Sequence, residues 1–125
     1  MNGSDQVGQS VNELETLRDK LRLFAADRDW DQFHSPKNLS MALSVEASEL
    51  LEHFQWLTEA QSLNVSLEKR EAAAEEIADV LLYLIRIADK LNINLVDAAN
   101  KKLALNAQKY PPDKSRGNSK KYTEI

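Results

Sequence analysis

The sequence contains no cysteine and only three glycines and three prolines among 125 residues. Without cysteine the chain has no disulfide framework, no thiolate metal site and no thiol nucleophile. Its longest uninterrupted apolar run, VLLYLI, has six residues, whereas a helix needs about 20 to span a bilayer. The first residues lack a basic segment followed by an apolar core, so no secretory signal is expected. We therefore expect a soluble, cytoplasmic protein.

The chain also lacks an excess of positive charge. Its net charge is −4 and its isoelectric point is about 5.2, which argues against a nucleic-acid polymer as partner because such binding depends on many phosphate contacts. A small anionic substrate is compatible with this net charge if a metal ion or a few basic groups help to bind it. The length suits one domain with a hydrophobic core.

Apolar residues recur at helical spacing, and no stretch alternates for long as a strand would. The sequence therefore predicts an all-α fold, a four-helix bundle within residues 10–112, between a flexible N-terminus at 1–9 and a polar C-terminal tail at 113–125. Helix starts are indicated by N-cap residues and first-turn partners. The expected helices run from Ser10 with Glu13 as capping partner, over 36–57 after Ser35, from Ser66 to about Leu91, and from Asn94 to Pro111.

The third expected helix carries the segment IADVLLYLIRIA, which is apolar on nearly every face. A helix of this kind has to be buried on all sides. One layer of four helices from 125 residues cannot easily cover it. The sequence therefore predicts a homo-oligomer that associates through this helix.

Acidic residues interrupt the apolar stripes of the second and third helices. On a helical wheel, Glu46 falls among leucines, and Glu49 lies one turn further along the same side. Glu76 and Asp79 repeat this arrangement in the third helix. The spacing alone is weak evidence, because composition predicts about three such pairs by chance. Their position in apolar stripes is the informative feature.

Carboxylates within an apolar stripe are costly unless something neutralises them, since a buried charge either destabilises the fold or shifts its pKa. Only Arg86 and His53 are cationic candidates nearby in the sequence. A divalent cation removes the difficulty, and oxygen ligands without histidine or cysteine favour Mg²⁺, with Mn²⁺ as a possible substitute. Ordinary solvated acid pairs, as at 68/71, are the alternative interpretation.

Aromatic and basic residues near these acids have two interpretations. Trp30, Trp56 and Tyr83 are either ordinary core residues or an aromatic wall for a flat ring beside the metal. Trp30 lies with His34 in the polar segment RDWDQFHS, which favours the second interpretation. Lys102 and Asn106 share one face of the fourth helix. They are solvated, or they meet a phosphate if that face closes the cleft.

These residues together resemble the MazG-like family of all-α nucleotide pyrophosphohydrolases. The family signature, E-x-x-E followed on a second helix by E-x-x-D, corresponds here to EASE at 46–49 and EIAD at 76–79. The flanking segments FAADRDWDQFHSPKNLSMALSVEASELLEHFQW, EEIADVLLYLIRIADKLNINL, KKLALNAQKYP and SKKYTEI are similar to the dCTP-pyrophosphatase-like and integron-cassette branch. The resemblance covers about residues 24–125. One departure is Val45, where many relatives carry an additional acid, and it bears on the number of metal ions held.

The resemblance implies a Mg²⁺-dependent homotetramer that cleaves a nucleoside triphosphate, dCTP-like in this branch, to monophosphate and pyrophosphate. It implies Glu46, Glu49, Glu76 and Asp79 as metal ligands and catalytic residues. It implies that the other site residues bind the nucleotide: Trp30, His34 and Trp56 at base and sugar, and Tyr83, Lys102 and Asn106 at the nucleotide or its phosphates. One carboxylate, with Glu49 preferred, would take the proton of the attacking water.

Two other functions remain open from the sequence. A phosphoribosyl-ATP-type pyrophosphohydrolase would use the same scaffold, although the aromatic residues of RDWDQFH and FQW favour a nucleobase pocket. A non-catalytic helical interaction protein would carry the acids as surface charges that are indifferent to metal.

Overall fold

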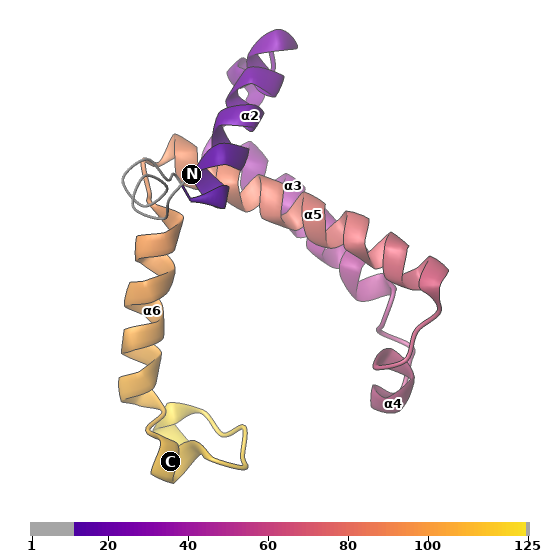
Figure 1. Ribbon diagram of the computed structural model, residues 1–125, viewed down its shortest axis with the longest axis vertical. Coiled ribbons are helices and arrows are strands. Elements are labelled where there is room, and N and C mark those ends of the chain that lie inside the picture. Colours follow the sequence, from indigo (N-terminus) through magenta and orange to yellow (C-terminus); the bar gives the residue numbers. More distant parts are fainter. Residues whose placement is uncertain (1–11, 125) are drawn as a thin grey trace, which may run out of the picture. The chain divides into compact units, whose positions relative to one another are not determined.

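The computed structural model describes residues 12–124, and within that range the regular structure consists of helices joined by turns and loops, without strands (Figure 1). The chain divides into two compact units between Asn92 and Ile93. The first contains α2 (Glu13–Asp27), the 3₁₀ turn η1 (Asp31–Phe33), α3 (Pro36–Glu52), α4 (Glu59–Ser62) and α5 (Leu67–Lys90). The second contains α6 (Leu95–Lys109), α7 (Pro112–Ser115) and η2 (Tyr122–Glu124). Nowhere in 12–124 is a helix both long and apolar enough to cross a membrane.

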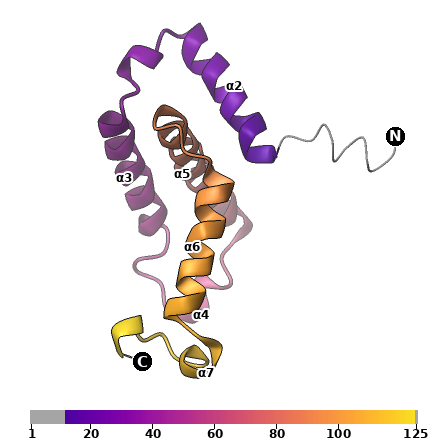
Figure 2. The same ribbon diagram turned by 90° about the vertical axis from the view of Figure 1, so that its left-hand side faces the viewer.

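Helices α3 and α5 form an antiparallel pair that is the centre of the first unit, and α2 packs against α5 (Figure 2). The buried apolar residues are small or branched: Ala25 on α2, Leu39 on α3, and Ala73, Ile85 and Ala88 on α5. Small side chains at a helix contact allow close approach of the two backbones. The centre of this pair positions the acidic residues described below.

The helix starts are where the sequence indicates, with one exception. Ser35, Ser66 and Asn94 each accept a backbone N–H as N-cap residues, which confirms three predictions. The first helix begins at Glu13 and not after Ser10, because the Asn12 side chain accepts the Glu15 N–H at 2.8 Å. Asparagine is as good an N-cap as serine. Ser10 and the predicted flexible segment 1–9 lie outside the described residues.

Helix α3 ends at Glu52, five residues before the predicted end at Leu57. After Glu52 the backbone tightens, and the N–H of His53 donates to the Leu50 carbonyl at 3.2 Å. The Lys69 ammonium, on α5, donates to the His53 carbonyl at 2.8 Å. A cation at a helix C-terminus satisfies exposed carbonyls and complements the dipole. Trp56 therefore lies beyond the end of the helix, whereas the predicted helix over 36–57 included it.

The connection between the second and third predicted helices and the predicted polar tail both contain short helices. Helix α4 begins with a complete capping box between Thr58 and Gln61. In the second unit the Tyr122 ring meets Tyr110 edge-on, with centroids 6.1 Å apart, and the Lys109 ammonium lies 4.8 Å from the Tyr122 centroid. These contacts connect the C-terminal segment to the end of α6. The predicted domain boundary at residue 112 stays a prediction.

Candidate active site

The antiparallel pairing of α3 and α5 brings three of the four predicted carboxylates together. Oxygen atoms of Glu46, Glu49 and Glu76 all lie within 4.8 Å of one another. All three side chains are half-buried. Glu46 and Glu49 are three residues apart on α3, so they share a face, and Glu76 approaches from α5. Three oxygen ligands at this separation form a site of the size and chemistry that a hard divalent cation requires.

Asp79, the fourth predicted acid, lies one turn beyond Glu76 on α5 and is more exposed than the other three. It is not within the 4.8 Å cluster. Its charge nevertheless contributes to the raised pKa of both Glu46 and Glu76. Asp79 also lines the pocket described below. It therefore stands between the carboxylate cluster and that pocket.

The carboxylates are poorly compensated by positive charge. Partial burial, followed by the neighbouring Glu76, Glu49 and Asp79 carboxylates, raises the pKa of Glu46 to about 7. The pKa of Glu76 is also raised, first by burial. Within residues 12–124 the one ion-pair partner of the cluster is His53, whose Nε2 lies 3.9 Å from Glu76 Oε1. A cluster that resists full ionisation in this way favours a bound cation.

The raised pKa of Glu46 predicts an unusual pH dependence of the cation-free protein. Between pH 4.5 and about 7, folded Glu46 keeps a proton that the unfolded chain has released, so the stability contribution of this group falls as pH rises. The lowered pKa of His34 acts in the opposite direction below about pH 6.5, whereas the lowered pKa values of Asp31 and Asp89 affect stability only below this range. Urea unfolding in chelator at about pH 5.5 and about pH 8 should therefore be compared between wild type and Glu46→Gln. The variant should gain stability relative to wild type at the higher pH. An equal pH dependence in both proteins would contradict the assigned pKa.

An apolar pocket of about 390 Å³ lies in the same unit, beside Asp79. Its lining includes Phe24, Trp30, His34, Tyr83 and Arg86. The Trp30 ring meets Phe24 edge-on at 5.7 Å and lies 6.4 Å from the His34 ring. The lining combines these aromatic rings with the charged side chains of Lys20, Asp79 and Arg86, which suits a flat, partly polar ring.

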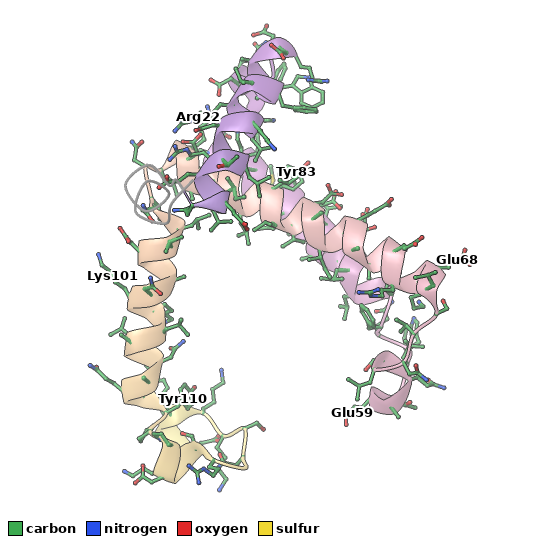
Figure 3. All side chains as sticks on the ribbon, in the orientation of Figure 1. Arg22, Glu59, Glu68, Tyr83, Lys101 and Tyr110 are labelled. Atoms are coloured by element: carbon green, nitrogen blue, oxygen red, sulfur yellow. The ribbon has the colours of Figure 1, made fainter. Side chains whose placement is uncertain are left out.

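Tyr83 connects the pocket with the carboxylates. It lines the pocket, and its phenol has a raised pKa because of burial first and then the charges of Glu46 and Asp79. Figure 3 shows Tyr83 on α5, within the part of that helix that runs beside α3. A ligand that fills the pocket can therefore place its anionic end near the carboxylate cluster.

Comparison with known protein families identifies the family of the chain. The model of the MazG-like family matches residues 41–125, which include all four acids. The chain belongs to the MazG-like family.

Individual proteins match the chain beyond that segment. dCTP pyrophosphatase 1 from Homo sapiens and from Rattus norvegicus are each 44% identical to the chain, and each match covers 93% of the chain and 71% of the relative. The crystal structure of a pyrophosphatase from Archaeoglobus fulgidus has a TM-score of 0.75 and 42% identity, over 82% of this chain and 96% of that one. The Archaeoglobus fulgidus protein is similar in fold as well as in sequence, which confirms an all-α MazG-like fold for this chain.

Three predicted site residues are not in the pocket or the cluster. Trp56 follows the end of α3 and is 87% exposed, and it does not line the pocket. Lys102 and Asn106 lie on α6, in the second unit, where Lys102 is exposed and Asn106 half-buried. Their roles in this MazG-like protein stay predictions, as do those of Trp30, His34 and Tyr83.

Phe24 and Arg86 line the pocket but were not among the predicted site residues. Arg86 was considered as a partner for the four acids, but it pairs with Asp31 and Asp89 instead. The signal for Arg86 was its isolation in the apolar run VLLYLIRIA, because a lone arginine in a buried segment needs dedicated partners.

Proposed function

We propose that this chain is a nucleoside triphosphate pyrophosphohydrolase that acts on dCTP-like nucleotides and uses Mg²⁺, or Mn²⁺ as a substitute. The observation that carries the proposal is a cluster of uncompensated, half-buried carboxylates next to an aromatic pocket. The relatives named dCTP pyrophosphatase support the reaction and the base. They also favour this function over a phosphoribosyl-ATP-type reaction. Because nucleoside triphosphates are intracellular metabolites, we place the enzyme in the cytoplasm.

The donor set fits a hard divalent cation. Glu46, Glu49 and Glu76 would hold it, with Asp79 at the pocket side, and all four offer oxygen only. When bound, such a cation neutralises phosphate charge and orients a water molecule. We assign Glu49 the role of the general base that accepts a proton from this water. The three clustered ligands are all glutamates, so only carboxylates are available for this role among them.

The remaining residues bind and orient the nucleotide in this proposal. Trp30 and Tyr83 provide aromatic surface for the base and sugar, and His34 a polar ring atom. A base held in the pocket directs its phosphates past Asp79 toward the cluster. Positioning of this kind is the main contribution a protein makes to phosphoryl chemistry. Lys102 and Asn106 are proposed to meet the phosphates, on the family resemblance.

Pyrophosphate release from a panel of nucleoside triphosphates tests the function. We expect release with Mg²⁺, none in excess chelator, and the highest rate with dCTP among dCTP, dATP, dUTP and CTP. Faster cleavage of dATP or dUTP would overturn the base preference and leave the pocket assignment intact. A protein that releases no pyrophosphate from any nucleotide would be the interaction protein that the sequence left open.

We propose in addition that the protein is a homo-oligomer, expected to be a tetramer. On α5, Ile77, Leu81 and Leu84 lie along one side of the helix and are 55%, 37% and 42% exposed. On α3, Met41 and Val45 are 52% and 55% exposed. Aligned exposed apolar residues of this kind indicate a surface that associates. Leu82, by contrast, lines the pocket of its own chain.

Replacing Ile77 by glutamate should disrupt this assembly. A new carboxylate in an apolar interface is costly, whereas at a 55% exposed position it should leave the single chain folded. Sedimentation at micromolar concentration should show a smaller species for Ile77→Glu and an unchanged species for Arg70→Glu, an exposed control on the same helix. A wild-type protein that sediments as a compact monomer would contradict the proposal.

A further inference from the structure

Arg86 is the one charged residue among 12–124 that is buried, with 6% of its surface exposed. A buried guanidinium is strongly destabilising unless its donors are paired. It has five N–H donors, no acceptor, and cannot lose its proton in a protein. The partners of Arg86 therefore reveal what holds its orientation and what that orientation does to them.

Two aspartates fix the plane of the guanidinium. Arg86 Nη2 donates to Asp31 Oδ1 at 2.5 Å, and Nη1 donates to Asp89 Oδ2 at 3.4 Å. Each aspartate is held by a second cation. Lys90 pairs with Asp31, and Arg22 donates to Asp89 Oδ2 through Nε at 2.8 Å. Figure 3 shows Arg22 on α2 near its crossing with α5. Because Nη1 and Nη2 are both hydrogen-bonded to aspartates, the orientation of the guanidinium is fixed and its Nε–H bond points in one direction.

That direction is toward His34. Arg86 Nε donates to His34 Nδ1 at 3.1 Å. Because arginine only donates, Nδ1 has to accept and therefore carries no proton. A neutral imidazole has one N–H, so the proton is on Nε2. Burial first, and then the charges of Arg86 and Lys90, lower the pKa of His34, which agrees with a neutral ring.

The Nε2 atom is available to a ligand. His34 lines the pocket, and among residues 12–124 no hydrogen-bond partner of Nε2 is present. Tautomeric freedom would let this histidine offer either a donor or an acceptor. Arg86 removes that freedom, in the same way that outer partners set the tautomer of metal-bound histidines.

We propose that Arg86 is a positioning residue that holds His34 as the Nε2–H tautomer, so that the pocket presents a hydrogen-bond donor to an acceptor atom of the nucleotide. The identity of the ligand rests on the proposed function. A pyrimidine carbonyl or ring nitrogen satisfies this donor, whereas an amino group in that position leaves two donors facing each other. An unpaired donor in a pocket is costly, so the tautomer contributes to the choice of base edge.

The state of His34 can be read without any nucleotide. The chain has two histidines, His34 and His53, so ¹⁵N-histidine spectra with His53→Gln as assignment control give the two ring nitrogens of His34. At about pH 8, where free imidazole is neutral, wild type should show an unprotonated Nδ1 and a protonated Nε2. Addition of dCMP should shift the Nε2 signal and leave Nδ1 unprotonated.

Arg86→Lys separates positioning from charge. Lysine keeps the positive charge but has a methylene where arginine has Nε–H, so His34 should become a mixture of tautomers. For dCTP we expect KM to rise about tenfold, the size of one lost neutral hydrogen bond, with kcat nearly unchanged. Arg70→Lys is the matched control. It makes the same change at an exposed position of α5, outside the network of Arg86, and it should leave both the spectrum and KM as in wild type.

A protonated Nδ1 in wild-type His34 would overturn the proposal directly, without any variant. So would an Arg86→Lys protein with wild-type tautomer and wild-type KM. If wild-type His34 shows the expected tautomer, Arg86→Lys releases it, and yet no nucleotide is cleaved, the action of Arg86 on His34 is supported and the proposed function fails.

Discussion

Glu49→Gln is expected to lower kcat for nucleotide hydrolysis by at least about 100-fold while the helix content stays the same. Glu49 is one of three carboxylates whose oxygens lie within 4.8 Å, and a bound metal contributes several kcal/mol to stabilising transition-state charge. Removing one charge from a repulsive cluster should leave the cation-free protein equally stable or more stable. Asp79→Asn should have the same effect on turnover. Pyrophosphate release and circular dichroism measure the two properties.

Two neighbouring glutamates provide matched controls. Glu52 on α3 and Glu75 on α5 are exposed and lie outside the cluster, so Glu52→Gln and Glu75→Gln should keep wild-type turnover. Mg²⁺ should raise the unfolding midpoint of wild type and of both controls, because a ligand that binds only the folded state stabilises it. Glu49→Gln should lose this shift. A Glu49→Gln, Asp79→Asn double variant with normal activity would disprove the site assignment.

The carboxylate cluster was predictable because both acid pairs follow the helical period. Glu46 and Glu49 share one face of any helix that contains them. An acid within an apolar stripe can already be recognised in the sequence as a candidate ligand. Pairing of α3 with α5 then needs only the short connection between them. The sequence did not predict that Glu76 lies within the cluster of Glu46 and Glu49 while Asp79 does not. This difference depends on where along α5 the two helices are closest.

The end of α3 and the role of Arg86 were not predictable for a different reason. Both depend on single contacts between residues far apart in the chain. Lys69 caps the carbonyl of His53 across 16 residues, and Arg86 reaches His34 across 52. No glycine or proline marks the end of α3 at Glu52, so helical periodicity continued the helix through Trp56. This error changes the expectation for Trp56.

The family resemblance assigns Trp56 to the base, although it does not line the pocket of the single chain; on that assignment, Trp56→Ala is expected to raise KM for dCTP by about ten- to a hundredfold and to leave the fold intact. The indole is 87% exposed, so truncation should change the free energy of unfolding by no more than about 0.5 kcal/mol. An aromatic side chain that stacks on a base contributes about 1–3 kcal/mol, which corresponds to the stated change if KM follows binding. Steady-state kinetics and urea unfolding measure the two quantities. The Mg²⁺-induced rise in the unfolding midpoint should persist, because the carboxylates remain.

Leu63 provides the control for Trp56. It is 89% exposed and lies at the end of α4, a few residues further along the chain, so Leu63→Ala removes exposed apolar surface without removing an aromatic ring. That variant should keep the wild-type KM. If Trp56 belongs instead to a buried core in the assembled protein, its truncation should cost about 3–5 kcal/mol and shift sedimentation. KM of the surviving fold would then hardly change, and the indole would have no place in the base pocket.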